Sequence, residues 1–470
     1  MKIRSLQNLS ANTIQLVVNQ FFGAVVFYIL SLGLDKSSFG QINLALAVLL
    51  SVFNILSFGI DQLVVKKVAQ GEDVPHVIRL YIGHVLLTGF IFYGLLLLGY
   101  IVFKTSPAYN LILWIGAGKL FIFFSMPFKQ VCSGLEKFKL LARMSVVSNC
   151  IRAFVLLALM LFHSLTIYSI IITFVSGDAL ELGYTLYLFY SNTGYRTKTT
   201  FDRSGYQTLL KESMPQLGVV LITSALARFD WLFIGFMVSD IKLAEYSFAY
   251  KVFEISTLPM LAIAPLLIPR FTRYFNSADP GSVNLKFLIR AELIIAAFTV
   301  LILNLSWEPV VNTLTHGKYG SVNVVTVFIL SLCIPMLYVN NFLWTIFFAK
   351  GRLKLILHAF IIMLAVNVGT NVILIPLYGN AGAALAYLAA CFAQTIFFLV
   401  KNEVSELKGV FVTMLVCTAC AIASGFLIRL IPINYMLQIA LSILIYIVLL
   451  FAGMQLKRND RYELKSFFHI

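Results

Sequence analysis

Runs of about 20 apolar residues recur along the whole chain, and they constrain its fold more than any other feature. A helix of about 20 residues crosses the hydrocarbon core of a bilayer. Charged residues make up only 12% of the sequence, against about 25% in soluble domains. We therefore predict an all-α polytopic membrane protein with about 14 transmembrane helices. The predicted spans lie near 11–32, 38–60, 80–103, 109–129, 143–163, 166–190, 213–238, 244–269, 290–314, 322–349, 355–376, 380–400, 409–430 and 434–456.

The distribution of basic residues predicts how these spans are oriented. With the N-terminus in the cytoplasm, 26 of the 35 Lys and Arg residues fall in inner segments and five in outer ones. Basic residues concentrate in cytoplasmic loops, so both termini are expected to be cytoplasmic. The net charge of +15 then reflects membrane topology, and a nucleic-acid partner is not expected.

The longest polar connection, 191–212, divides the spans into two groups. We predict an N-terminal lobe of six helices over 1–200, a second six-helix lobe over 201–403, and two further helices with a basic cytoplasmic tail over 404–470. FGQINLALA at 39–47 is weakly echoed by LAEYSFAYK at 243–251, at the entrance to corresponding spans. Internal repeats of this kind are common in transporters.

Four basic residues lie deep in the predicted spans, where a charge costs about 2.5–3.5 kcal/mol on insertion scales. They are Lys119, Arg152, Arg228 and Lys251. Span directions place Asp230 level with Lys251, and Arg228 level with Glu254. Either these residues form two ion pairs that hold helices together, or they line a hydrated cavity and bind substrate or a coupling ion.

Other polar residues at depth extend this pattern. Asp178 and Glu181 share one span and are expected to compensate Lys119 and Arg152. Further polar side chains recur at helical spacing, which indicates helix–helix hydrogen bonds of about 0.6 kcal/mol each or a cavity for a hydroxyl-rich ligand. These stripes comprise Asn12, Gln15 and Asn19; Asn54, Ser57 and Asp61; and Asn367 with Asn371.

Several function classes are disfavoured by what the sequence lacks. No phosphate-binding loop, dinucleotide fingerprint, nucleophile elbow or zinc-protease motif occurs, and the six cysteines have no metal-like spacing. The outer loops are short, which leaves little chain to carry catalytic groups. We expect no enzyme activity, no metal and no cofactor.

Three segments carry a resemblance to a known family. SLGLDKSSFGQINLALAVLLSVFNILSFGIDQLVVKKVA at 31–69, ARFDWLFIGFMVSDIKLAEYSFAYKVFEISTLPMLAIAPLLIPRFTRYF at 227–275 and LIPLYGNAGAALAYLAA at 374–390 resemble the lipid-linked oligosaccharide flippases of O-antigen and capsule assembly. These flippases form the polysaccharide-transporter branch of the MOP superfamily, which also contains the multidrug and toxic compound extruders.

This resemblance implies two lobes around a central cavity in the bacterial inner membrane. The implied substrate is an undecaprenyl-pyrophosphate-linked oligosaccharide, moved to the periplasmic leaflet by a proton or sodium gradient. Implied partners are the lipid bilayer and other membrane proteins of polysaccharide assembly. The four deep cations would contact the pyrophosphate. The acids Asp230, Glu254, Asp178, Glu181 and Asp61 would bind coupling ions or pair with cations, and Asn19, Asn54, Asn367 and Asn371 would line the cavity.

Three alternatives remain open on the sequence. A multidrug-type exporter would share the fold, although deep cations disfavour cationic drugs. A lipid II-type flippase would account for 14 spans rather than the 12 described for many polysaccharide flippases. A membrane polysaccharide polymerase or glycosyltransferase would need a large outer loop, which the predicted topology does not provide.

Overall fold

The computed structural model describes residues 2–103, 105–195, 202–276 and 284–456, and this part of the chain is helical without any strand. The all-α class predicted from the apolar runs is therefore confirmed. The basic tail and the side chains of Asn12 and Gln15 lie outside what is described. Contacts divide the chain into two compact units, Met1–Ala244 and Glu245–Ile470.

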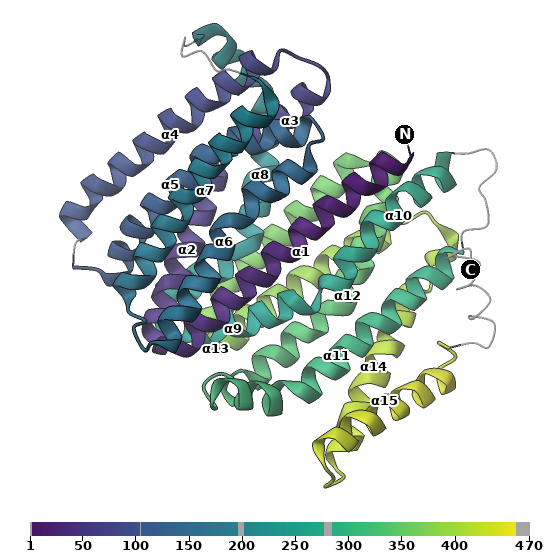
Figure 1. The fold of residues 1–470 in the computed structure, drawn as a ribbon. Coiled ribbons are helices and arrows are strands. Elements are labelled where there is room, and N and C mark those ends of the chain that lie inside the picture. The colour runs from purple at the N-terminus through teal and green to yellow at the C-terminus, as the bar shows by residue number, and fades with distance from the viewer. Residues whose placement is uncertain (1, 104, 196–201, 277–283, 457–470) are drawn as a thin grey trace. The chain divides into compact units, whose positions relative to one another are not determined.

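The first unit is built around α5, which packs against α7, α4, α2 and α3 (Figure 1). A second set of contacts joins α1 to α6, α6 to α7, and α8 to α2. The helices are α1 (Lys2–Gly33), α2 (Lys36–Leu56), α3 (Ile60–Ala69), α4 (Val74–Phe103), α5 (Pro107–Gly134), α6 (Phe138–Leu161), α7 (Ile167–Thr193), α8 (Arg203–Met237) and the start of α9 (Asp240–Ser256).

The second unit is built around α12, which packs against α13, α11 and α10, while α14 packs against α11 and α15. The helices are the remainder of α9, α10 (Leu258–Asn276), α11 (Leu285–Thr315), α12 (Val324–Ala349), α13 (Leu353–Val400), α14 (Val410–Arg429) and α15 (Tyr435–Ala452). Two short 3₁₀ helices, Ser321–Asn323 and Ser405–Leu407, precede α12 and α14.

Two predicted spans, 38–60 and 244–269, contain breaks that the apolar pattern does not reveal. The segment 36–69 is interrupted at Phe58 and Gly59, which have φ values of 57° and 71°. Such left-handed backbone suits glycine and ends the regular helix. The segment 240–276 breaks at Thr257, between α9 and α10.

A third break lies inside α13, at the boundary between the predicted spans 355–376 and 380–400, where its two halves meet at Gly379 with φ 55° and ψ −126°. A side chain at Gly382 would lie 2.0 Å from the Leu374 carbonyl oxygen. In a straight helix these residues would be about 12 Å apart at 1.5 Å per residue. The chain therefore reverses direction at Gly379, and α13 is a helical hairpin with almost no loop.

Ten helices in the described residues are long and apolar enough to cross a membrane. Many of their large apolar side chains are exposed, as on α4 at Leu98, Ile101 and Val102. Exposed apolar surface on this scale is expected of a protein whose solvent is lipid. A helix coincides with each predicted span. The count of 14 crossings and the three-part division at 200 and 403 stay predictions, although the contacts place α8 with the first unit.

Candidate functional site

Three helices of the first unit bring five charged side chains into one buried cluster. Asp178 and Glu181 lie three residues apart on α7 and so share a face of that helix. Gly118 on α5 permits a close approach, since a Cβ there would lie 3.0 Å from Asp178 Oδ2 and 3.1 Å from Val175 Cα. We call this set the α5–α7 charge cluster. It consists of Lys119 and Lys129 on α5, Arg152 on α6, and Asp178 and Glu181 on α7.

Asp178 is the centre of the cluster and is fully buried. Its Oδ1 accepts hydrogen bonds from the Arg152 guanidinium and, at 2.5 Å, from the Ser148 hydroxyl. Lys119 Nζ lies 3.6 Å from Oδ2. The expectation that Asp178 compensates both Lys119 and Arg152 therefore agrees with the structure.

Glu181 has a different partner from the one expected. Its Oε1 accepts a 2.5 Å hydrogen bond from Lys129 Nζ, and its Oε2 accepts one from the Ser148 backbone N–H at 2.8 Å. The sequence had placed Lys129 in an inner loop. Because α5 continues to Gly134, Lys129 instead lies within the helix and is buried.

Arg152 connects the cluster to further groups. Its guanidinium lies 4.2 Å above the centre of the Phe174 ring and donates to Asn149 Oδ1 at 3.5 Å. The Asn149 amide in turn donates to Asn19 Oδ1 on α1 at 3.3 Å. A continuous polar path thus links α1, α6 and α7.

The charges of the cluster do not balance. Three cations face two carboxylates, so the fully ionised cluster carries one surplus positive charge. Lys119 has the longest ion-pair distance of the three cations and a side chain that is 24% exposed, whereas Arg152 and Lys129 are almost fully buried. Within the cluster, Lys119 is therefore the cation best placed to receive an additional anion.

The charged residues near the end of α8 and on α9 make local contacts. The Arg228 guanidinium lies 4.5 Å above the centre of the Trp231 ring. Buried Asp230 accepts a 2.9 Å hydrogen bond from the backbone N–H of Trp231. Lys251 and Glu254 share a helix face, as expected, and pair at 2.8 Å. The predicted pairs Asp230–Lys251 and Arg228–Glu254 join residues of different units and stay predictions.

The remaining predicted residues have hydrogen bonds to other groups. The Tyr81 hydroxyl donates to Asp61, which lies on α3. The backbone carbonyl of Asn54 accepts from the Ser57 hydroxyl at 2.8 Å. In the second unit, buried Asn371 donates its amide to Asn367 Oδ1 at 3.1 Å. The structure therefore divides the predicted site residues among several separate groups.

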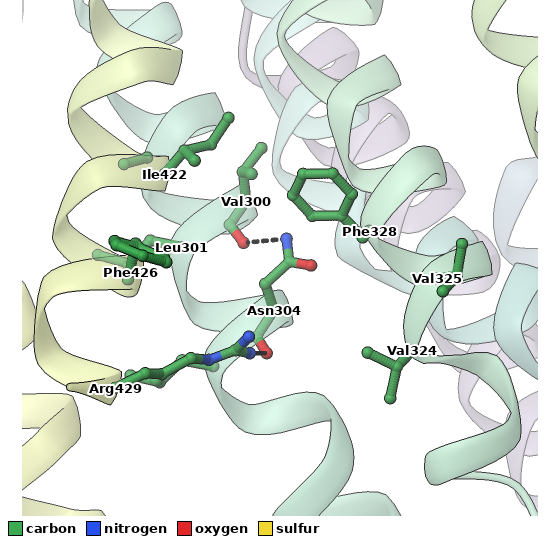
Figure 2. Close-up of a pocket in the computed structure, with 12 residues that line it drawn as sticks. Val300, Leu301, Asn304, Val324, Val325, Phe328, Ile422, Phe426 and Arg429 are labelled. Carbon is green, nitrogen blue, oxygen red and sulfur yellow. Dashed lines mark hydrogen bonds between the residues drawn. The ribbon is translucent and has the colours of Figure 1, made fainter.

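A second feature is an apolar pocket of about 330 Å³ between α11, α12 and α14 of the second unit (Figure 2). It is lined by Val300, Leu301, Asn304, Leu305, Val324, Val325, Phe328, Ala421, Ile422, Gly425, Phe426 and Arg429. The Arg429 guanidinium donates to the Asn304 backbone oxygen at 2.8 Å. The Asn304 amide donates to Val300 O and to Ser331 Oγ. The volume lies at the lower end of the roughly 300–1,000 Å³ of small-molecule pockets.

Solved structures with the same arrangement of helices are transporters. The chain matches a lipid II flippase, MurJ, in an inward closed conformation, with a TM-score of 0.73, 15% identity, and coverage of 94% of this chain and 98% of that one. An inward-facing multidrug resistance MATE transporter of the MOP superfamily matches with a TM-score of 0.65, 13% identity, and coverage of 86% and 98%. A MOP superfamily transporter from Pyrococcus furiosus matches with a TM-score of 0.56, 13% identity, and coverage of 86% and 94%.

The apolar helices and these similarities define a multi-pass membrane protein with a MurJ/MATE-like transporter fold. A family model described as "Polysaccharide biosynthesis protein" matches residues 5–275, which is more than half of the chain. The chain therefore belongs to the polysaccharide biosynthesis protein family. Comparison with curated proteins gave no match.

Proposed function

We propose that this protein is a flippase that moves an undecaprenyl-pyrophosphate-linked oligosaccharide repeat unit across the bacterial inner membrane, for O-antigen or capsule assembly. Movement would be from the cytoplasmic to the periplasmic leaflet, driven by a proton or sodium gradient without a bound cofactor. Membership of the polysaccharide biosynthesis family and the flippase-like fold support this proposal. Both termini would face the cytoplasm, as the distribution of basic residues predicts.

The observation that carries the proposal is the surplus positive charge of the α5–α7 charge cluster. A pyrophosphate diester is an anion, and an ammonium group binds it as a compact point charge. Lys119 is held less closely by Asp178 than Arg152 is, so a phosphate oxygen can replace Asp178 as its partner while Arg152 keeps the carboxylate neutralised. One of the two negative charges of the pyrophosphate diester offsets the surplus positive charge of the cluster, which lowers the cost of keeping that charge away from water.

The apolar pocket within the second unit is a further feature compatible with a lipid-linked substrate. Its lining is almost entirely aliphatic and aromatic, with Arg429 at its edge. Such a lining suits a hydrocarbon chain. A cationic drug is a poorer fit to the protein, because the charge cluster repels positive charge.

The proposal is tested by replacing Lys119 in a flippase-deficient strain whose repeat-unit chemistry is known. Lys119→Gln removes the charge and is expected to reduce surface polysaccharide at least tenfold at equal protein level. Lys119→Arg keeps the charge and should retain part of the activity. Lys211→Gln, which changes an exposed lysine of α8, is the matched control and should behave as wild type. Normal polysaccharide in the Lys119→Gln strain, at normal protein level, would overturn the role of Lys119.

A further inference from the structure

A carboxyl group outside the charge cluster is buried in the second unit. Glu292 lies on α11, seven residues after the helix begins, and is only 5% exposed. Its Oε1 has no hydrogen-bond partner in the described part of the chain. Glu292 is the third residue of the predicted span 290–314.

One group on α12 interacts electrostatically with this carboxyl. The fully buried Tyr338 hydroxyl lies within electrostatic range of Glu292 and next to the backbone of Met260. It makes no hydrogen bond of normal geometry among the described residues. The Glu292 carboxyl and the Tyr338 hydroxyl are thus two buried polar groups that interact electrostatically, each with an oxygen that has no hydrogen-bond partner among the described residues.

Most of the other titratable groups on α11 and on the elements that pack against it have contacts elsewhere. On α15, Tyr446 donates to the Ile294 carbonyl at 2.9 Å, and in the 3₁₀ helix before α14, Glu406 accepts from Tyr274 at 3.2 Å. Arg290 on α11 lies 5.9 Å from the Phe287 ring centre. On α14, Arg429 donates to the Asn304 carbonyl at 2.8 Å. The remaining groups are the thiols Cys417 and Cys420 on α14, Cys333 on α12, whose electrostatic neighbour is Cys391, and the Tyr435 hydroxyl at the start of α15. None of these is a cation that is seen to pair with Glu292.

The physical consequence concerns the charge state of Glu292. An ionised carboxylate that is buried without a cation or hydrogen-bond donors pays a desolvation cost of several kcal/mol. The protonated acid avoids this cost and gains an O–H donor. The surroundings of Glu292 therefore favour the protonated form in this conformation.

The site also adjoins a break in the chain. Met260 is in the first turn of α10, directly after the interruption at Thr257, and its N–H donates to the Thr257 carbonyl at 3.1 Å. Tyr338 touches this turn from α12. A shift of α10 at the break would change the surroundings of Tyr338 and Glu292 together, and so their access to water.

We propose that Glu292 is a proton-binding site of the second unit, with the Tyr338 hydroxyl as a nearby polar group and the α9–α10 break as the element that opens it. The carboxylate binds one proton from water when the site is open, keeps it as a carboxylic acid when the site is closed, and releases the same proton when it reopens. This inference rests on the proposed ion-coupled transport, to which it assigns the proton as coupling ion.

The proton can be observed without any transport assay. Infrared difference spectra of the purified full-length protein, between acidic and alkaline buffer, report the carbonyl stretch of protonated carboxyl groups. The wild type should show a band in the buried-carboxyl region that Glu292→Gln lacks and that Tyr338→Phe shifts in frequency. Glu308→Gln, which alters an exposed carboxyl on the same helix, is the control and should keep the band.

An unchanged band in Glu292→Gln would overturn the proposal, because the protonated carboxyl would then belong to another residue. If Glu292→Gln does not fold, Glu292→Asp provides the same test through a shifted band. This outcome is separate from the flippase assay. If the wild-type protein complements the strain but its purified form shows no Glu292 band, only the proton site is refuted. If the band is present but the wild-type protein does not complement the strain, only the flippase proposal is refuted.

Discussion

Replacing Asp178 by Asn tests whether the α5–α7 charge cluster is held together by its central carboxylate. The change keeps the size of the side chain but leaves Arg152 and Lys119 without their shared anion. Breaking a buried ion pair from one side costs about 3–5 kcal/mol. Because Lys119 is partly exposed, water weakens its interaction with Asp178, and we expect Asp178→Asn to lower the free energy of unfolding by about 3 kcal/mol.

This loss can be converted into a melting temperature. For units of 150–250 residues, about 1 kcal/mol corresponds to a shift of 2–4 °C, so Asp178→Asn should melt roughly 6–12 °C below wild type in detergent. The double variant Arg152→Gln/Asp178→Asn restores the original charge difference and should recover about half of the loss. Glu72→Gln, which alters a partly exposed ion pair with Lys67, should change little. An Asp178→Asn protein that melts with wild type, or a double variant no more stable than the single one, would refute the reasoning.

Two further predictions concern packing and a surface ion pair. Gly40→Ala should destabilise the first unit by about 1–3 kcal/mol, because the added Cβ would lie 1.9 Å from the Asp240 carbonyl oxygen. The control is Gly94→Ala, which has open space around it and should be neutral or stabilising. Equal decreases in the melting temperatures of the two variants would contradict this prediction. Glu403 accepts hydrogen bonds of 2.7 and 2.6 Å from Arg352, which hold the pKa of this carboxyl below its ordinary value of 4.5. Because the pKa of Glu403 is lowered in the folded state, the ion pair stabilises the fold above pH 4.5, and this stabilisation is lost as the pH falls. The difference in melting temperature between wild type and Glu403→Gln should therefore disappear in acid. A difference that grows in acid would rule out the ion pair as its source.

The positions of the helices follow closely from the apolar runs, because a bilayer demands about 20 apolar residues from each crossing. The predicted span 166–190, for example, corresponds to α7 at Ile167–Thr193. The breaks at Gly59 and Thr257 could not be predicted in this way, since hydropathy does not change where the backbone turns. They depend on backbone angles that neighbouring helices stabilise.

The charge cluster was only partly predictable. Depth along each span correctly suggested Asp178 as the counter-charge for Lys119 and Arg152. The partnership of Glu181 with Lys129 depends on where α5 ends, and α5 extends five residues beyond the predicted apolar span. Glu292 lies within the predicted span 290–314 but was not singled out, because its burial depends on how other helices cover the first turns of α11.

The hairpin turn at Gly379 has a mechanical consequence. A conventional loop would let the two halves of α13 tilt independently, but here one residue joins them and the backbone of Leu374 touches Gly382. A change in the angle between the two halves therefore alters the contact between Leu374 and Gly382 directly. A displacement of the half that carries the buried Asn367–Asn371 pair reaches the 380–400 half first through this contact.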